Sequence, residues 1–497
     1  MSTLPARLAA QVRAAPDRPA LAEGGRALDR AGLWREIAAM AARLQAAGVA
    51  AGDRVAVRLA NGVDAVAAWY GAWLAGAVVV PLNPQVHARD LVTWLTHSGA
   101  IAVIGRDDDA GIAAACAQMP APVHLLAPSP PAAPPSGGPI LADEPQLDAV
   151  APAAIVYTSG TTGTPKGVTL SHGNLHHNTA AIIDYLQLGA EDRGVTVLPF
   201  WYAYGASVLN THLAAGAFLA IETHSQYPHL VVQALERHRA TGFSGVPSTF
   251  ALLLEHGRLD QADLSALRYL TQAGGAMAPA LTRRLRAALP AARLFVMYGQ
   301  TEASARLTFL DPDRVDRKPG AVGGPVAGVE LAIRHADGST ALPGEEGEVW
   351  ARGGNIMAGY WQAPEATAQV LRDGWLRTGD LGRIDEEGDL WLAGRRSDII
   401  KTGAHRVHPV DVEQVIAELP GVREVAVCGV DDALLGQAVA ALVVADPAQL
   451  SGEMAVKAHC RAHLPTYKIP RLVRFVDALP RTASGKIRRA DLATELS

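Results

Sequence analysis

The stretch at residues 157–167, Tyr-Thr-Ser-Gly-Thr-Thr-Gly-Thr-Pro-Lys-Gly, constrains the fold of this chain more than any other. It follows an apolar run at residues 151–156, which predicts a buried strand. Glycines allow positive φ angles and a close approach of the backbone to a ligand. Exposed N–H groups, hydroxyls and the ammonium of Lys166 suit a polyphosphate. The sequence therefore predicts a buried strand that leads into a phosphate-binding loop.

The stretch taken alone leaves a second interpretation open. A turn rich in Ser, Thr and Gly is common on protein surfaces and has the same composition. The order also differs from that of the P-loop, because Pro165 and Lys166 come after the glycines of residues 160 and 163. Further motifs are needed to decide between the two interpretations.

Four later motifs decide it. They are Tyr-Gly-Gln-Thr-Glu at 298–302, Thr-Gly-Asp at 378–380, Gly-Arg at 394–395 and Pro-Arg-Thr-Ala-Ser-Gly-Lys at 480–486. Together with the first stretch, and in this order, they resemble the adenylate-forming superfamily, which includes the acyl-CoA and aryl-CoA synthetases. The resemblance runs from about residue 16 to residue 492.

The resemblance implies an α/β protein with two domains. A large N-terminal domain at 1–396 is expected to combine α/β layers with a small β-rich subdomain and to bind ATP and the acid. A small α+β lid at 397–497 is expected to move, with the boundary at Arg396 and Ser397. The length of 497 residues independently predicts two or more domains.

Bulk properties limit the class of protein. A net charge of −5 and a pI near 6.3 give no reason to expect a nucleic-acid or membrane-surface partner. Cys116, Cys428 and Cys460 form neither a disulfide framework nor a zinc pattern, and the N-terminus lacks the apolar segment of a signal peptide. The cysteine pattern therefore predicts a reducing cytoplasm.

Local patterns predict the elements around these motifs. An amphipathic helix is expected at 29–47 and a strand at 54–59. The uncharged run at 65–82 is interrupted by glycines and Pro81, so a buried helix, a turn at Gly76 and a core strand are expected, and not a membrane span. Further expectations are a linker at 128–139, alternating helices and strands up to Arg293, short strands at 320–392, a helix at 412–419 and strands at 425–430 and 438–444.

The resemblance also implies the nucleotide site. The residues expected to hold the phosphates of ATP are Thr158, Ser159, Gly160, Thr161, Thr162, Gly163 and Lys166. The residues expected around the adenosine are Gly274, Gly275, Ala276, Tyr298, Gly299, Thr301, Asp380 and Arg395, with Asp380 on the ribose hydroxyls. Glu302 is expected to bind Mg²⁺. The structural alternatives are a solvated glutamate, a turn-forming aspartate and a buried tyrosine.

Lys486 is the residue expected to catalyse adenylation. It lies on a glycine-containing loop near the C-terminus, and its ammonium would bridge the carboxylate of the acid and the α-phosphate. The alternative is a solvated lysine, which its neighbours Arg488 and Arg489 also suit. The basic run is too short for a nucleic-acid tail.

The histidines are not expected to be catalytic. His172, His176 and His177 include a pair at i, i+4, but no cysteine or carboxylate accompanies them, so a metal site is not expected. His405 and His408 lie in the lid loop, where a surface or tunnel-lining position is expected.

The pocket for the acid is expected to be lined by Tyr202, Tyr204, Ser207, Val246, Gln272 and Gln300. Trp201 and the two tyrosines place three aromatic residues together, which favours an aryl or medium-sized acid over a long alkyl chain. Arg306 is a weaker candidate for pairing with an acidic or polar substituent. No aspartate is positioned for the ammonium of an amino acid.

Three positions depart from the family pattern. Tyr202 replaces the usual histidine of the acyl-binding stretch, and it does not titrate near neutral pH. The lid loop has Gly403 and Ala404 where many CoA ligases have two glycines, and Ser397 replaces the frequent Asp or Lys of the hinge. These differences put the transfer to CoA more in question than the adenylation.

The resemblance implies an ATP-dependent ligase that forms an acyl-adenylate with release of pyrophosphate and then an acyl-CoA. The expected cofactors are ATP, Mg²⁺ and CoA. An alternative acceptor is the phosphopantetheine of a carrier protein acting in trans, or another nucleophile. A nucleotide sensor without activity would have lost Lys166, Glu302, Asp380 or Lys486, and all four are present.

Overall fold

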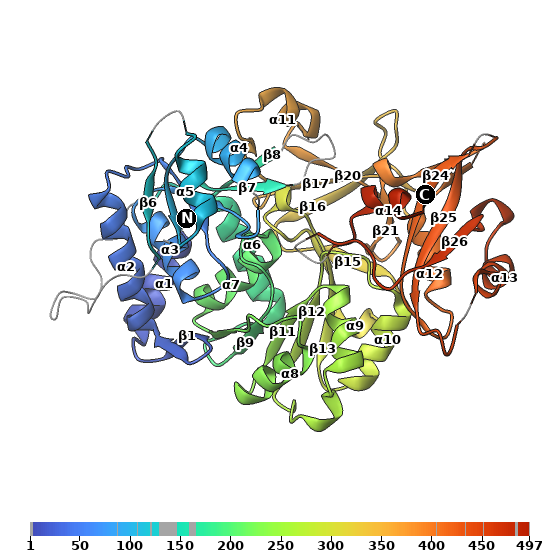
Figure 1. The fold of residues 1–497 in the computed structure, drawn as a ribbon, viewed down its shortest axis with the longest axis horizontal. Coiled ribbons are helices and arrows are strands. Elements are labelled where there is room, and N and C mark those ends of the chain that lie inside the picture. The colour runs from blue at the N-terminus through green and yellow to red at the C-terminus, as the bar shows by residue number, and fades with distance from the viewer. Residues whose placement is uncertain are drawn as a thin grey trace.

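The computed structural model describes residues 3–86, 88–106, 108–119, 122–128, 147–158, 166–403, 405–432, 434–450, 452–482 and 486–496. These residues form three sheets with helices packed between and around them (Figure 1). The predicted linker at 128–139 lies outside the described residues except for its first position. In the described residues no helix is long and apolar enough to cross a membrane.

The first sheet carries the strand that was predicted before the glycine-rich stretch. In spatial order its strands are β18 (Gly359–Tyr360), β8 (Lys166–Ser171), β7 (Pro152–Thr158), β4 (Val78–Pro81), β3 (Arg54–Arg58), β5 (Ala100–Gly105) and β6 (His124–Leu126). The strands from β7 to β6 run parallel, whereas β8 returns antiparallel to β7. The glycine-rich stretch therefore joins two antiparallel strands, which differs from the strand-to-helix connection of a P-loop.

The second sheet continues through both the α/β part and the β-rich part of the chain. Its order is β16 (Val329–Arg334), β17 (Gly347–Gly353), β20 (Trp375–Ile384), β21 (Leu390–Arg395), β15 (Ala321–Pro325), β14 (Thr308–Leu310), β13 (Arg293–Tyr298), β12 (Tyr269–Gln272), β11 (Gly242–Gly245), β9 (Arg193–Thr196), β10 (Phe218–Ile221), β1 (Pro19–Glu23) and β2 (Arg26–Asp29). In addition, β19 (Leu371–Arg372) pairs with β20. Strands β13, β12, β11, β9, β10 and β1 are parallel, so their carboxyl ends share one edge.

Helices fill the space between these two sheets and cover their outer faces. They are α1 (Leu4–Ala14), α2 (Arg30–Ala46), α3 (Val63–Leu74), α4 (Ala88–Ser98), α5 (Ala110–Cys116), α6 (His172–Leu186), α7 (Ala203–Ala215), α8 (Pro228–Arg237), α9 (Pro247–His256), α10 (Pro279–Ala288) and α11 (Pro364–Val370). The short helices are η1 (Leu259–Gln261), η2 (Thr301–Ala303), η3 (Pro312–Arg314), η4 (Arg396–Asp398) and η5 (Thr466–Lys468). Helices α3 and α7 are buried nearly all round and share one apolar core with strands of both sheets.

Most local predictions are confirmed. Helix α2 begins after Asp29, whose side chain accepts a hydrogen bond from the backbone N–H of Gly32, as an N-cap does. The uncharged run at 65–82 forms α3, a turn at Gly76 with φ of +80°, and the buried strand β4. The short strands predicted at 320–392 are present, and the pairing of β14 with β15 joins them to the α/β sheet.

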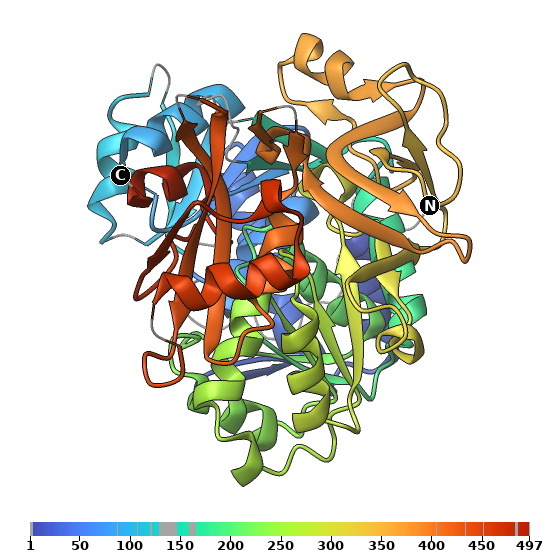
Figure 2. The same ribbon diagram turned by 90° about the vertical axis from the view of Figure 1, so that its right-hand side faces the viewer.

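The C-terminal part has a sheet of its own, ordered β23 (His405–Val407), β22 (Ile400–Thr402), β25 (Gly436–Ala445) and β24 (Val422–Asp432), with β26 (Leu472–Phe475) on β25. Its helices are α12 (Pro409–Ile416), α13 (Glu453–His463) and α14 (Arg489–Leu496). The two long strands predicted here are present. The helix predicted at 412–419 begins three residues earlier, because Pro409 occupies its first turn, where a proline costs no hydrogen bond. Figure 2 shows this part lying across the front of the larger one.

Candidate active site

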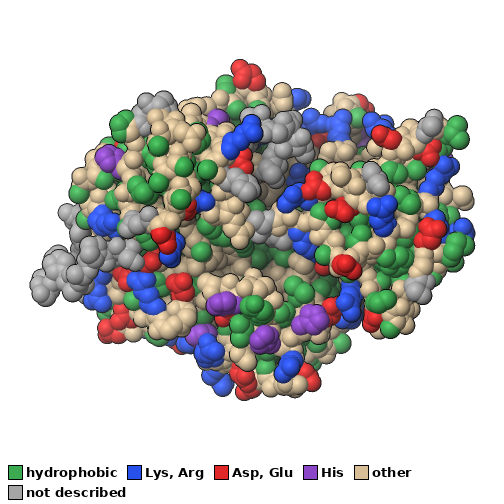
Figure 3. Space-filling model, viewed as in Figure 1, with side chains coloured by type: hydrophobic (Ala, Val, Ile, Leu, Met, Phe, Trp, Pro, Cys, Tyr) green, Lys and Arg blue, Asp and Glu red, His purple; other side chains and the backbone are tan. Residues whose placement is uncertain are grey.

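The predicted nucleotide residues converge where the C-terminal part meets the large domain. The space-filling view shows a hollow near the middle of the visible face, between the two parts of the molecule (Figure 3). Strands β11, β12 and β13 direct their carboxyl ends toward this region, which is where open parallel sheets hold their ligands. Strands β8, β20 and β21 contribute the remaining predicted residues.

Lys166 and Glu302 are linked by a third residue, Tyr360. Lys166 is the first residue of β8 and pairs in register with Thr158 across the hairpin. Its ammonium lies 5.1 Å from the centre of the Tyr360 ring, and the Tyr360 hydroxyl donates a 3.0 Å hydrogen bond to Glu302. Burial and the charge of Glu302 raise the pKa of Tyr360, so the phenol stays protonated and acts as a donor. Tyr360 thus holds Glu302 in place and leaves its second oxygen available.

Tyr298, Asp380 and Arg395 form a second group. The Tyr298 hydroxyl donates a 2.5 Å hydrogen bond to one oxygen of Asp380, and Nε of Arg395 lies 3.3 Å from the other. Asp380 is 7% exposed. Burial raises the pKa of Asp380, whereas Arg395 and the hydrogen bond from Tyr298 oppose this change. The group presents a buried carboxylate whose position is fixed from two sides.

Lys486 reaches the end of β12. A Cβ atom added to Gly274 would lie 3.7 Å from Cε of Lys486 and 3.1 Å from Cγ1 of Val246. Gly274 also has φ of +86°, a conformation that favours glycine. The side chain of Lys486 therefore lies against Gly274, a position where any other residue would be strained.

The charges near Lys486 suit an incoming anion. Lys486 keeps contact with solvent, yet the protein around its ammonium lowers its pKa by desolvation, and the positive charge of Arg395 adds to this effect. The negative charges of Glu302 and Asp380 act in the opposite direction. Two cations thus face the same space, and an anionic substrate would offset their repulsion.

Other predicted adenosine residues occupy the same region. Gly275 and Ala276 are exposed beside Gly274, and the carbonyl of Gly275 accepts a 2.8 Å hydrogen bond from Gln272. Gly299 is packed so closely that an added Cβ would lie 2.0 Å from the carbonyl oxygen of Ala305. Thr301 begins helix η2. The predicted phosphate residues Ser159, Gly160, Thr161, Thr162 and Gly163 lie outside the described residues.

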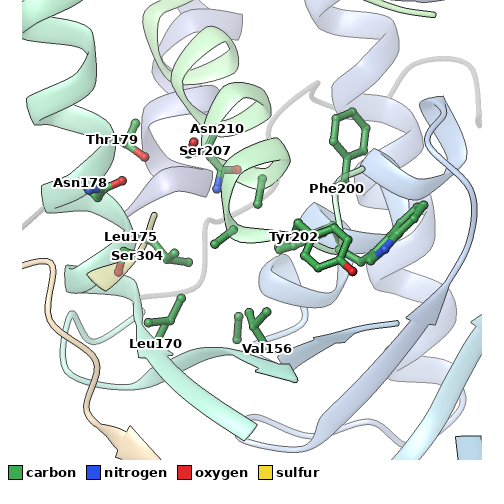
Figure 4. Close-up of a pocket in the computed structure, with 15 residues that line it drawn as sticks. Val156, Leu170, Leu175, Asn178, Thr179, Phe200, Tyr202, Ser207, Asn210 and Ser304 are labelled. Carbon is green, nitrogen blue, oxygen red and sulfur yellow. The ribbon is translucent and has the colours of Figure 1, made fainter. Parts of the chain in front are cut away.

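Two cavities border the predicted acid pocket and meet at Ser207 of α7. The larger lies between strands β7 and β8 and helices α6 and α7. Figure 4 shows Tyr202 and Phe200 on one side of it, and Asn178 and Thr179 of α6 on the other. Tyr202 is half-buried at the start of α7, so it lines the cavity at its entrance.

The smaller cavity lies between β11 and β12 on one side and helices α6 and α7 on the other. Its wall consists of Ile182, Leu186, Ser207, Val208, Thr211, His212, Ser244, Tyr269, Thr271 and Arg306. Tyr204 lines neither cavity, and its hydroxyl donates a 2.9 Å hydrogen bond to the Thr271 carbonyl. Its ring instead lies under the Arg306 guanidinium, 4.8 Å away.

The other predicted pocket residues lie between these cavities and Lys486. Val246 precedes helix α9 and contacts the Gly274 segment. Gln272 is buried and hydrogen-bonded within the turn after β12. Gln300 precedes η2, and its amide nitrogen is buried without a partner in the described structure. An unpaired buried donor costs stability, so a ligand acceptor at this position would satisfy Gln300.

Sequence reasoning missed Tyr360. The Tyr360 hydroxyl bonds to a residue 58 positions away in the chain, and β18, which carries it, has two residues. No local pattern signals such a contact. Its only sequence signal is an aromatic pair, Tyr360 and Trp361, in a chain with 5% aromatic residues.

The histidines of the lid lie away from the nucleotide residues. His405 stacks on Tyr467 with ring centres 4.0 Å apart. His408 instead bridges the two parts of the molecule, with Nε2 3.1 Å from Oε1 of Glu346. The Glu346 carboxylate raises the pKa of His408.

Comparison with known proteins agrees with this arrangement. The family model described as AMP-binding enzyme matches residues 8–361, and the AMP-binding enzyme C-terminal domain matches 411–486. The chain is similar to a feruloyl-CoA synthase of Amycolatopsis sp, with 37% identity over 97% of this chain and 96% of that protein. It is also similar to the 2-succinylbenzoate–CoA ligase of Geobacillus kaustophilus, with 34% identity over 99% and 98%.

A solved structure extends the likeness to three dimensions. The o-succinylbenzoate CoA synthetase of Bacillus subtilis, in complex with its acyl-adenylate intermediate, superposes with a TM-score of 0.85. Identity is 28%, and the match covers 99% of this chain and 98% of that one.

Proposed function

The chain belongs to the AMP-binding enzymes, an adenylate-forming family, and from this premise we propose which of its residues act and on which class of acid. The protein is an AMP-forming acid–CoA ligase: it activates a carboxylic acid to an acyl-adenylate with release of pyrophosphate and then transfers the acyl group to CoA. We assign roles in the reaction to Lys486, Asp380 and Glu302 because their side chains lie around one cleft.

In the first half-reaction the carboxylate of the acid attacks the α-phosphorus of ATP. Lys486 holds the two anions together at the Gly274 segment, because its ammonium can donate to both. Lys166, whose ammonium lies beside the ring of Tyr360, neutralises the leaving pyrophosphate. Asp380 retains the ribose through hydrogen bonds that its remaining lone pairs can accept.

Glu302 fits a Mg²⁺ site. One of its oxygens is occupied by Tyr360, and the other can bind a hard cation. Among the described residues no group of three or more His, Cys, Asp or Glu side chains could hold a metal alone, so the phosphates of the nucleotide and water would complete the coordination. Such an ion supplies positive charge to the triphosphate.

The substrate we propose is an aryl or medium-sized carboxylic acid. Tyr202 lines the larger cavity with apolar neighbours, and this wall suits a flat or compact group. The similar proteins named above act on feruloyl and 2-succinylbenzoyl groups, both of which are aromatic.

CoA is the acceptor that the comparisons support, and a carrier protein has no support from them. A cytoplasmic location rests on three unpaired cysteines.

A matched screen of acids tests this proposal. We expect benzoates, cinnamates and medium-chain acids to give higher kcat/KM than long-chain fatty acids, because Tyr202 and polar side chains such as Asn178 and Ser207 line the cavities. The measurement is acid-dependent pyrophosphate release followed by CoA thioester formation. A preference for long-chain acids would refute the substrate class, and absence of thioester with every acid would refute CoA as acceptor.

We further propose that the lid is hinged at Arg396 and Ser397. Residues 362–410 lie between the two family matches, and the short helix η4 (Arg396–Asp398) falls within them. This supports a domain boundary at Arg396 and Ser397. Lys486 faces the cleft in the described arrangement, so this is the lid position for adenylation. Rotation about the hinge would bring the Gly403 loop to the site for the transfer to CoA.

The pair formed by His408 and Glu346 makes that lid position depend on pH. Glu346 raises the pKa of His408, while Asp411 adds to the effect and Lys468 opposes it. The contribution of this ion pair to the stability of the lid position is complete below the ordinary imidazole pKa of 6.5. It is lost as the pH rises through the raised pKa of His408. His408 lowers the pKa of Glu346 in return, so the pair persists to acidic pH.

We therefore expect adenylation by the wild type to exceed that by Glu346→Gln most near pH 6, by up to roughly fivefold, since a partly exposed ion pair contributes about 1 kcal/mol or less. The ratio should approach one above the raised pKa of His408, where its imidazole is neutral. Pyrophosphate release across this range measures it. A ratio that does not change with pH would show that the pair has no part in holding the lid.

A further inference from the structure

Arg306 is a buried cation that has no carboxylate partner among the residues that the structure describes. Four Arg or Lys side chains of the described chain are buried, namely Arg30, Arg58, Arg306 and Lys318. Lys318 bonds to Asp385 and Asp389, and Arg58 to Asp109. Arg306 is 2% exposed, and no described carboxylate lies within 4.0 Å of it. A buried charge is costly unless it is paired and hydrogen-bonded.

The hydrogen bonds of Arg306 do not compensate for the missing anion. Nε donates to the Tyr185 hydroxyl at 3.2 Å, Nη2 to Ser207 at 3.4 Å and Nη1 to the carbonyl of Ala305 at 3.5 Å. Two of these distances exceed the usual range for N–H···O bonds. A guanidinium has five N–H donors, so two of them have no acceptor among the described residues.

Arg30 shows what a structural arginine looks like in the same protein. Its guanidinium is equally buried, makes the same number of hydrogen bonds, leaves Nε without a partner and has no carboxylate nearby among the described residues, but its three bonds all go to backbone carbonyls, of Gln11 at 3.0 Å, Ala15 at 3.4 Å and Gly216 at 2.5 Å. These carbonyls end helices α1 and α7, where negative partial charge accumulates. Arg306 instead has two neutral hydroxyls, the carbonyl of its own neighbour and the ring face of Tyr204, none of which carries a full negative charge.

Arg306 faces a polar space. It lines the smaller cavity with Ser207, Ser244 and Thr271, and it is the one charged side chain in that wall. His212, also in the wall, is neutral there because burial lowers its pKa. The cavity therefore offers hydroxyls and one cation to a ligand, with no anion of its own.

The backbone that carries Arg306 is strained. Ser304 and Ala305, the two residues before it, have φ of +55° and +97°, although neither is glycine. Such conformations persist only where the surroundings hold them, and they concentrate at functional sites. Asn355 donates a 2.7 Å hydrogen bond to the Arg306 carbonyl and thereby holds this turn. The strain fixes the direction of the guanidinium into the cavity.

The cavity lies at a defined depth below the reacting centre. Thr271 on β12 and Ser244 on β11 line it, whereas Gly274 and Val246 mark the strand ends where Lys486 arrives. Gly274 comes three residues after Thr271, and Val246 comes two residues after Ser244. At about 3.3 Å per residue along a strand, this corresponds to roughly 7–10 Å. A group at Arg306 would thus lie one ring or a short chain away from the carboxylate that is activated.

We propose that Arg306 binds a second oxyanion at the distal end of the acid, so that the substrates of this ligase are acids with a further carboxylate or sulfonate. This inference rests on the proposed function, because it assumes that the acid enters between Lys486 and the smaller cavity. The guanidinium would form the paired, charge-assisted contact that it lacks in the protein alone. Ser207 lies within reach of Arg306, and its hydroxyl would turn from the Tyr204 carbonyl to which it now donates.

Matched pairs of acids test the proposal. Suberate and terephthalate are compared with their monomethyl esters, which keep the shape and remove one charge. We expect the wild type to prefer each diacid in kcat/KM for pyrophosphate release by at least roughly tenfold, beyond the statistical factor for two equivalent carboxylates, since hydrogen bonds to charged groups have that effect. Equal or better use of the monoesters would overturn the proposal, whatever the variants do.

Variants locate the preference on Arg306. In Arg306→Met the preference for the diacid should disappear while the monoesters keep their kcat/KM within a few-fold, and Arg306→Lys should retain part of it. Arg268→Met is the matched control: Arg268 pairs with Asp192 and lies over the ring of Tyr269 but is not part of the cavity wall, so this variant also loses an ion pair without changing the cavity. Equal losses for diacids and monoesters in Arg306→Met, with a lowered Tm, would assign Arg306 a structural role and overturn the proposal.

Ser207→Ala provides a second variant if Arg306→Met does not fold. It should reduce the diacid preference by a smaller factor, and an unchanged preference would count against the site. Failure of every acid to release pyrophosphate would instead contradict the proposed function. Normal activity with the monoesters and no gain from a second charge would leave that function intact and remove only the distal site.

Discussion

Lys486→Ala is expected to reduce adenylate formation by roughly 10²- to 10³-fold while ATP still binds, because a preorganised charge at a reacting centre contributes on this scale. Lys486 lies against Gly274 at the end of β12. Arg395 is the other cation in that space, but its Nε is already 3.3 Å from Asp380. Nothing nearby in the described structure can replace the lysine.

The two half-reactions should respond differently. Pyrophosphate release from ATP and the acid measures the first, and thioester formation from a synthetic acyl-adenylate and CoA measures the second. If the lid rotates between them, Lys486 acts only in the first, so Lys486→Ala should convert the supplied adenylate at nearly the wild-type rate. Equal loss in both half-reactions would mean that the variant damages the whole cleft.

A second lysine of the lid provides the control. Lys457 lies on α13, where it pairs with Glu453 one helical turn away. Lys457→Ala removes the same charge from the same domain at the cost of one surface ion pair, which contributes little. If Lys457→Ala forms the adenylate normally and Lys486→Ala does not, the loss cannot result from the lower positive charge of the lid alone. Normal acid-dependent pyrophosphate release by Lys486→Ala would refute its catalytic role.

The fold was predictable where a local pattern determines it. The apolar run before the glycine-rich stretch is strand β7, and Asp29 caps helix α2, because periodicity and capping are properties of neighbouring residues. The boundary of α12 was displaced because Pro409 can begin a helix as well as interrupt one. The joining of the β-rich part to the α/β sheet depends on pairing between β14 and β15, which no single segment encodes.

The site was predictable only in part for the same reason. Lys166, Glu302, Asp380 and Lys486 stand in motifs, so resemblance could name them. Their relations could not be read from the chain: the bond from Tyr298 to Asp380 spans 82 positions, and Tyr360 reaches Glu302 over 58. These contacts exist because strands distant in sequence end at one edge.

Arg306 shows a different limit. Arginine is mostly exposed in proteins, and it is the common basic residue of this chain, so its sequence position suggested little. Only the structure shows that its side chain is buried in a cavity wall without a carboxylate. The information that distinguishes a specificity residue from a surface charge lies in what surrounds it.

Asp380→Asn is expected to lower kcat/KM for ATP by roughly 10²-fold, because each hydrogen bond to a charged group contributes about 1.5–3 kcal/mol. The Asp380 carboxylate already accepts from Tyr298 and faces Arg395, and its remaining lone pairs point to the cleft. The amide replaces one acceptor oxygen by a donor and removes the charge. Acid-dependent pyrophosphate release at varied ATP measures the change.

An exposed aspartate on the preceding turn gives the matched control. Asp373 has φ of +51°, a conformation that asparagine also tolerates, and it lies outside the cleft wall. Asp373→Asn should therefore leave kcat/KM for ATP unchanged. A similar loss in both variants would trace the effect to the folding of β20 and not to the ribose.

The nucleotide analogue 2′-deoxy-ATP tests whether Asp380 contacts the ribose at all. The wild type should use it less well than ATP by roughly tenfold or more, the contribution of one hydrogen bond to a carboxylate. In Asp380→Asn the ratio should fall toward one, because the partner of the missing hydroxyl is already impaired, and such non-additivity is the mark of a direct contact. If the variant discriminates between the two nucleotides as strongly as the wild type, the 2′-hydroxyl binds elsewhere, and Asp380 serves only to position Tyr298 and Arg395.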